Sequence, residues 1–176
     1  MQPVKKIAFF SLLAISLFLV AGLNSGCGIY RFNDASIPDS IKTIRINIFE
    51  NRAPYVNPQL AQQLTERVQR KIVSQTKLSR TNAENAHYDL KATVVDYAVT
   101  TSGVSDRNTT QNRLTVTVEV TLTNQLNNNS ESKYTISRPF DFSANLSLQA
   151  AENSPAYAEL LKGLADDIFN RLFSEW

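Results

Sequence analysis

The sequence of 176 residues contains one cysteine, one histidine and five glycines. A single cysteine cannot close a disulfide within the chain, and there is no Cys/His set of the kind that binds zinc. No GxSxG or HExxH motif and no glycine-rich phosphate loop occurs. The lone His87 lies just ahead of a predicted strand, where a solvated turn residue is the ordinary interpretation. We therefore expect a non-enzyme without a bound cofactor or metal.

The sequence also lacks an excess of charge of one sign. Its net charge is +2, but Lys5 and Lys6 precede a long apolar run that is typical of a cleaved leader. Without them, sixteen basic side chains face sixteen acidic ones. A nucleic-acid partner needs a concentrated excess of Lys and Arg, so none is expected. Any anion must bind at a local cluster of cations.

The first residues have the order of a secretory signal: the basic stretch MQPVKK, then apolar residues 7–23, then Asn24–Cys27. The small residues before Cys27 allow a peptidase to approach the backbone. We predict that residues 1–26 are removed. We also predict that the cysteine sulfur carries a diacylglycerol and its new amino group an acyl chain such as palmitate.

The cleavage site resembles a lipobox with Leu23 one position early and Asn24 where a small or apolar residue is common. The alternative is an uncleaved membrane anchor. The run of residues 7–23, seventeen long and interrupted only by Ser11 and Ser16, is at the short limit for a hydrocarbon core that normally takes about 20. Two or more acyl chains would anchor the protein stably without spanning the bilayer.

Residues 27–41 are predicted to be a lipidated tether, and residues 42–176 a single domain. Segments with strand patterns are 42–48, 88–100, 113–123 and 133–142. Segments with the period of amphipathic helices are 57–76 and 155–173. Polar segments 101–112 and 124–132 are predicted to be hairpin-type loops.

Two details of the strands follow from the pattern. The apolar face switches near Val94 and Val95, which indicates either a β-bulge or a strand buried on both faces. Pro139 confines the last strand to an edge or terminates it. The order β-α-β-β-β-α predicts an α+β two-layer sandwich, with about four strands and both helices on one face. The other face would be rich in threonine and solvated.

Two groups of side chains are candidate contacts. Arg67, Arg70 and Lys77 fall on one flank of the first helix, although charged flanks are usually only solvated. Phe169 and Phe173 lie off the apolar stripe of the last helix, and Trp176 ends the chain. Such aromatics suggest a partner contact, with packing onto the sheet edge as the alternative.

Several segments together resemble a known family. They are GCGIYRFNDASIP, SIKTIRINIFENRA, NPQLAQQLTERVQRKIVSQTKL, RLTVTVEVTLTNQ and DDIFNRLFSEW. Their order and spacing are similar to the lipopolysaccharide-assembly lipoprotein family, LptE, in the form found in Bacteroidetes. No single segment is a catalytic motif, and the resemblance covers essentially the whole chain after the leader.

The resemblance implies an outer-membrane lipoprotein that faces the periplasm, plugs the lumen of a large β-barrel of the LptD type, assists its assembly and binds lipopolysaccharide. It also implies a small sheet with two helices on one side. Local cations such as Arg45, Arg67 and Arg70 would then bind phosphates by charge-assisted hydrogen bonds. Only Cys27 is carried over from the family by position. No acidic run of the kind used for surface export follows it.

Two other functions stay open on the sequence. A free-standing periplasmic carrier of lipid or glycan would need an apolar cavity inside the domain. An adaptor for another envelope machine, such as a secretin pilot, would be distinguished by the barrel that co-purifies with it.

Overall fold

The computed structural model describes residues 37–55, 57–105 and 108–174, with side chains omitted for 102–110. The predicted leader, Cys27 and Trp176 lie outside the described residues. Ile41 is buried, and Ile37 packs against the core, so the packed domain includes residues just ahead of the predicted boundary at 42. Within the described residues, no helix is both long and apolar enough to cross a bilayer.

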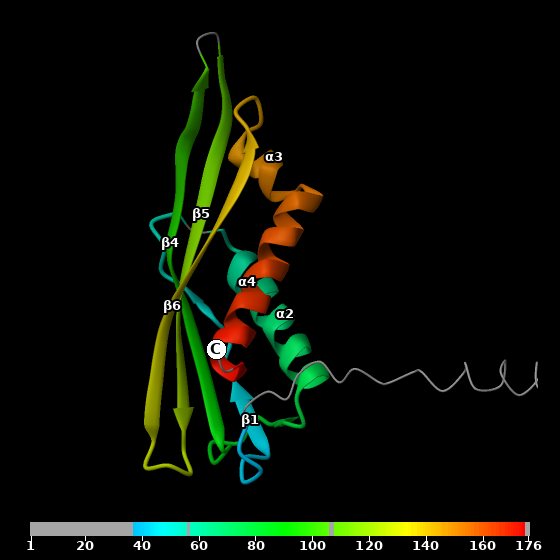
Figure 1. The fold of residues 1–176 in the computed structure, drawn as a ribbon, viewed down its shortest axis with the longest axis vertical. Coiled ribbons are helices and arrows are strands. Elements are labelled where there is room, and N and C mark those ends of the chain that lie inside the picture. The colour runs from blue at the N-terminus through cyan, green and yellow to red at the C-terminus, as the bar shows by residue number, and fades with distance from the viewer. Residues whose placement is uncertain (1–36, 56, 106–107, 175–176) are drawn as a thin grey trace, which may run out of the picture. The chain divides into compact units, whose positions relative to one another are not determined.

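The residues that the structure describes form one mixed sheet and three helices (Figure 1). The strands are β1 (Thr43–Ile46), β2 (Glu50–Asn51), β3 (Ser79–Arg80), β4 (Tyr88–Ser105), β5 (Asn108–Asn124) and β6 (Ser130–Ser143). The helices are α2 (Leu60–Gln75), α3 (Leu148–Glu152) and α4 (Pro155–Phe173). The predicted α+β class is confirmed. The prediction of about four strands and two helices was too low, because β2, β3 and α3 are too short to show a periodic pattern.

The sheet has the order β3-β1-β4-β5-β6, with β2 paired to β4 beyond the end of β1. The short strands β1 and β2 run parallel to β4, whereas β4, β5 and β6 form an antiparallel meander. The strand β6 is at the edge of the sheet, as Pro139 predicted. Proline has no N–H to donate, and an edge strand has a neighbour on one side only. The missing donor therefore costs no hydrogen bond to a second neighbouring strand.

Helices α2 and α4 lie side by side on one face of this sheet (Figure 1). The aliphatic side chains of β5 point toward them and are buried: Leu114, Val116, Val118, Val120 and Leu122. The buried stripe of α2 contains Leu60, Leu64, Val68 and Ile72, and that of α4 contains Leu161, Leu164 and Ile168. Together these side chains form the core between the two layers, as the predicted sandwich requires.

The β4–β5 hairpin is longer than predicted. Residues 101–112 were expected to be a loop, but β4 continues to Ser105 and β5 begins at Asn108, with Thr101 paired to Asn112. The polar side chains in this part give no apolar alternation, although backbone pairing does not require one. The second connection contains a tight turn in which Asn128 and Asn129 have positive φ. Asparagine tolerates this conformation better than most residues.

The switch of faces in β4 is a β-bulge. Val94 pairs with Val118 and Asp96 with Thr117, so Val95 is the extra residue. The bulge returns Tyr97 to the helix-facing side of the sheet, where it is buried. Of the two alternatives that the sequence left open, the bulge is therefore confirmed.

Helix starts follow the capping rules. The Asn57 side chain accepts hydrogen bonds from the backbone N–H groups of Gln59 and Leu60 at 2.9 and 3.2 Å. Ser154 accepts one from Tyr157 N–H at 3.2 Å, immediately before Pro155 opens α4. Both side chains satisfy amides that the first helical turn leaves unpaired.

Gly163, in the middle of α4, allows a side chain from β6 to cross the helix. A Cβ atom at this position would collide with the guanidinium of Arg138. That guanidinium donates to Asp167 Oδ2 at 2.6 Å. The glycine therefore makes room for an ion pair that joins the sheet edge to α4.

We predict that Gly163→Ala leaves the free energy of unfolding nearly unchanged. Alanine favours a helix by about 1 kcal/mol over glycine. Displacing Arg138 from Asp167 loses an ion pair whose exposure limits its value to about 1 kcal/mol or less. In an Arg138→Ala background the same substitution should stabilise by about 1 kcal/mol, measured by urea denaturation. Equal destabilisation in both backgrounds would contradict this account.

Candidate functional site

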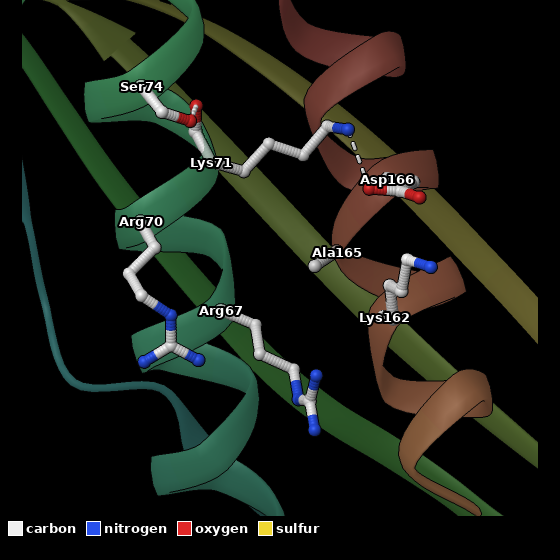
Figure 2. A pocket seen from close by; sticks show the side chains of 7 residues that line it. All are labelled: Arg67, Arg70, Lys71, Ser74, Lys162, Ala165 and Asp166. Carbon is white, nitrogen blue, oxygen red and sulfur yellow. Dashed lines mark hydrogen bonds and ion pairs between the residues drawn. The ribbon is translucent and has the colours of Figure 1, made fainter. Parts of the chain in front are cut away.

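An open cleft of about 470 Å³ lies between α2 and α4. We call it the α2–α4 cleft (Figure 2). Its lining residues are Arg67, Arg70, Lys71, Ser74, Lys162, Ala165 and Asp166. Four of these are cations and one is a carboxylate, which leaves an excess of three positive charges at the wall. This is the kind of local cation cluster that an otherwise balanced chain needs to bind an anion.

Helical periodicity brings these residues together. Arg67, Arg70 and Ser74 occur at intervals of three and four residues, so they share one side of α2. Lys162 and Asp166 are likewise four residues apart on α4. The small side chain of Ala165 lies between the two rows, and Arg67 extends from α2 toward α4 (Figure 2).

Lys71 and Asp166 form the ion pair that connects the two helices. Their Nζ and Oδ1 atoms are 2.6 Å apart, and the Lys71 side chain is 20% exposed. The same ammonium lies 5.3 Å from the centre of the Phe169 ring, within reach of a cation–π contact. Lys71 is therefore held in place, and the Asp166 carboxylate is already paired with it rather than with another cation of the cleft.

The other three cations are much less constrained. Arg70 faces Glu66 at 3.8 Å and Lys162 faces Glu159 at 3.4 Å, each on its own helix and exposed. Exposed pairs of this type contribute little and are readily exchanged. Arg67 has no carboxylate partner among the residues that the structure describes. These three groups are available to a ligand.

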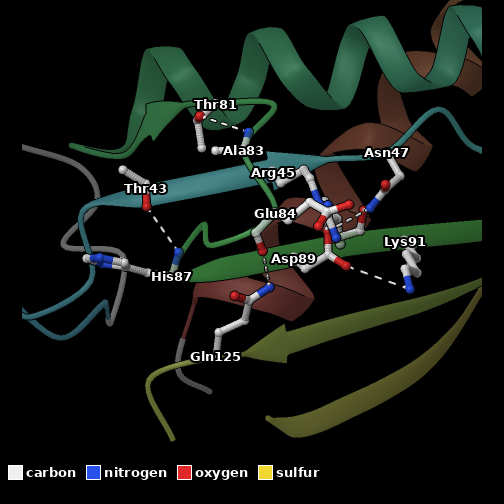
Figure 3. Close-up of polar contacts among 11 residues, drawn as sticks. Thr43, Arg45, Asn47, Thr81, Ala83, Glu84, His87, Asp89, Lys91 and Gln125 are labelled. Atoms are coloured by element: carbon white, nitrogen blue, oxygen red, sulfur yellow. Dashed lines mark hydrogen bonds and ion pairs between the residues drawn. The ribbon is translucent and has the colours of Figure 1, made fainter.

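The structure separates the predicted cations. Arg67 and Arg70 both line the cleft, whereas Lys77 lies two residues beyond the end of α2, exposed and outside the cleft. Arg45 lies elsewhere, on β1, where its Nε donates to Asp89 Oδ1 at 2.7 Å (Figure 3). Its orientation is therefore explained by this pair rather than by a site for a ligand.

The Asp89 carboxylate is almost buried, with 6% of its side chain exposed. Burial opposes its ionisation, but hydrogen bonds from Arg45 and Asn47 outweigh it and lower the pKa of Asp89 below its ordinary value. Lys91, at 3.7 Å, adds to the effect. The same pairing raises the pKa of Arg45. This charged cluster links β1 to β4 at the position where Arg45 and Asp89 are paired in the parallel register.

The placement of Phe169 and Phe173 outside the core was wrong. Their exposed fractions are 0% and 3%. Because α4 packs against both the sheet and α2, its buried arc is wider than a single apolar stripe. Phe169 faces Lys71 of α2, and Phe173 contacts Tyr88 with ring centres 6.3 Å apart. Neither side chain is available at the surface as a partner contact.

Sequence reasoning missed the other cleft residues. Lys71 and Ser74 are on the same side of α2 as the predicted arginines, so their spacing offered a signal. Lys162 and Asp166 offered none, because only the packing of α4 beside α2 brings them there. The described residues contain no cluster of His, Cys, Asp and Glu suited to a metal ion.

The domain thus combines a two-layer α+β fold with a cationic cleft on its helical side. The model of one family, LptE, described as lipopolysaccharide-assembly, matches residues 41–172. This range covers nearly all of the described domain. The chain therefore belongs to the LptE family, as its sequence resemblance indicated. No curated protein matches it.

Several solved structures are similar. The hypothetical protein CT253 from Chlamydia trachomatis is 11% identical with a TM-score of 0.50, covering 77% of this chain and 99% of that one. Lipoprotein B from Nitrosomonas europaea is 16% identical with a TM-score of 0.49, covering 76% and 83%. A minor lipoprotein from Acinetobacter baumannii is 16% identical with a TM-score of 0.46, covering 76% and 93%. At 11% identity, the likeness to the first shows the fold alone.

We predict that Asp89→Asn lowers the free energy of unfolding at pH 7 by about 2 kcal/mol, because Arg45 loses a charge-assisted partner. A carboxylate whose pKa is lowered by folding stabilises above its unfolded pKa of about 3.9 and loses that contribution as the pH falls through the folded value. The gap between wild type and variant should thus be constant above about pH 5 and shrink below about pH 4.

Urea denaturation at several pH values measures this gap. Glu119→Gln, at an exposed carboxylate on β5, is the control and should change stability little at any pH. If the difference in free energy of unfolding between wild type and Asp89→Asn is as large at pH 3 as at pH 7, the ionised Asp89 carboxylate does not stabilise the fold as predicted.

Proposed function

We propose that this chain is a lipid-anchored outer-membrane subunit of a lipopolysaccharide-assembly translocon. It plugs the lumen of a β-barrel of the LptD type, assists its assembly and binds lipopolysaccharide. The observation that carries the proposal is the match of the LptE family over residues 41–172. The role is structural and binding, without a catalytic step.

The face of the sheet away from the helices supports the proposal that the domain plugs the barrel lumen. Along β5, the side chains Thr115, Thr117, Thr121 and Thr123 are partly exposed on the side away from the helices. Thr117 and Ser137 are in hydrogen-bonding contact across the strands at 3.1 Å. A hydroxyl-rich face can contact the polar interior of a barrel without exposing apolar surface to water. A permanent complex of this kind buries on the order of 2,000 Å² or more.

The α2–α4 cleft supports a ligand that is anionic. It is open and lined mainly by charged side chains, unlike the enclosed apolar cavity that a free-standing lipid carrier needs. No observation favours the carrier or the adaptor over the barrel subunit.

We predict that the full chain, tagged at its C-terminus and purified from detergent-solubilised envelope, retains a large outer-membrane β-barrel in about equal amount. Thr121→Glu should reduce this yield strongly, because it places a charge in the contact. Lys91 and Lys133 lie opposite Thr121 on the neighbouring strands, so the isolated domain should accept the glutamate. Gln62→Glu, at an exposed position of α2, is the matched control.

Recovery of the tagged chain alone would contradict the barrel partnership. An equal loss of the barrel with both glutamate variants would contradict the assignment of the contact to the threonine face. Circular dichroism of each variant distinguishes lost folding from lost contact.

We predict that Cys27 carries the lipid. Mass spectrometry of the purified chain should find a new N-terminus at Cys27, with a diacylglyceryl group on sulfur and an acyl chain on nitrogen. In Cys27→Ser, chain that is not bound to the barrel should be released from the membrane fraction, because the acyl chains supply stable anchoring. An unmodified thiol at Cys27 in the membrane-bound protein would contradict the anchor.

A further inference from the structure

We infer that the α2–α4 cleft is the site at which this protein holds a phosphate group of lipopolysaccharide. The inference deepens the proposed function and rests on it. It assigns the ligand contact to Arg67, Arg70 and Lys162, and excludes Arg45 and Lys77 from that contact.

The first reason is the difference in pairing between the cations. Lys71 is fixed by a 2.6 Å contact with Asp166, and Arg45 by a 2.7 Å contact with the buried Asp89. Arg67 has no carboxylate partner within the described part of the chain, and Arg70 is 3.8 Å from Glu66. A ligand would therefore replace only water and weak exposed pairs at the cleft. At Arg45 it would have to break a partly buried ion pair.

The second reason is the chemistry of the groups. Two guanidinium groups on one helix present planar pairs of N–H donors, which match the oxygens of a phosphate better than a single ammonium does. Lys162 lines the cleft from the facing helix and supplies a third charge. The excess of three positive charges suits a phosphate monoester, which carries up to two negative charges. A neutral sugar offers no such match.

The third reason is position. The helices cover one face of the sheet, so the cleft on their outer side and the threonine face lie on opposite sides of the two-layer domain (Figures 1 and 2). A barrel wall that contacts the domain through its threonine face does not occupy the cleft. One domain can therefore hold its partner and its ligand at the same time.

The test measures binding of the full, detergent-solubilised chain to lipopolysaccharide, with fluorescence or calorimetry as readout. Arg67→Gln and Lys162→Gln should each weaken binding by roughly tenfold, the effect of removing one charge-assisted contact. Lys77→Gln is the matched control, because it removes the same charge from an exposed position outside the cleft. It should change binding by less than about twofold. Thermal unfolding of each variant verifies that the fold is intact.

The variant Asp166→Asn distinguishes a ligand site from a cleft whose charged side chains only stabilise the fold. It removes the carboxylate from the cleft and frees Lys71, so lipopolysaccharide binding should tighten several-fold while stability falls slightly. Weaker binding by Asp166→Asn would count against the inference.

Three further ligands identify the chemistry. Lipopolysaccharide treated with a phosphatase should bind wild type roughly tenfold more weakly and should no longer distinguish Arg67→Gln from wild type. Inorganic phosphate at millimolar concentration should compete. Vesicles of phosphatidylglycerol should bind less tightly than lipopolysaccharide. Equal and equally variant-sensitive binding of those vesicles would overturn lipopolysaccharide as the occupant.

The outcomes separate this inference from the proposed function. The inference alone is overturned if lipopolysaccharide binds tightly and Arg67→Gln and Lys162→Gln do not weaken that binding. It is also overturned if Lys77→Gln weakens binding as much as these two variants do. No binding of either form of lipopolysaccharide overturns both the inference and the ligand part of the proposed function. The barrel partnership is then judged separately by co-purification.

Discussion

The strict alternation along β5 is the constraint on which the rest of this structure depends. Every second side chain from Leu114 to Leu122 is aliphatic and buried, and the intervening positions are threonine except for Glu119. A sheet with one apolar face can be covered only on that face. Both long helices must therefore share it, lying side by side. The cleft between them and the hydroxyl face behind them are two consequences of this single pattern.

The parts of the fold that the sequence predicted are those in which one element carries a long periodic signal. The strand around Val118, the helix around Val68 and the helix around Leu164 all belong to this group. The two-residue strands β2 and β3 are formed by pairing with neighbours that the chain reaches only after folding. Their residues have no local pattern to detect. The polar extension of the β4–β5 hairpin was missed for a related reason, since its ladder is continued by backbone groups that every sequence has.

The cleft residues divide in the same way, into those that a local pattern predicts and those that only the packing of distant elements brings together. Arg67 and Arg70 could be placed together from spacing on one helix, because the helical period alone determines it. Lys162 could not, because it lies 95 residues beyond Arg67 in the chain, and the distance between them depends on how α2 and α4 pack on the sheet. Conversely, the sequence offered no means of knowing that Arg45 is paired. That pairing depends on the parallel register that sets Arg45 opposite Asp89.

The error over Phe169 bears directly on the site. The ring of Phe169 is fully buried and lies beneath the ammonium of Lys71, which in turn reaches Asp166 of α4. The aromatic side chain fills the space between the helices, and the ion pair closes over it. These contacts join α2 to α4 directly below the cleft. A charged surface site thus takes its geometry from the apolar core directly below it.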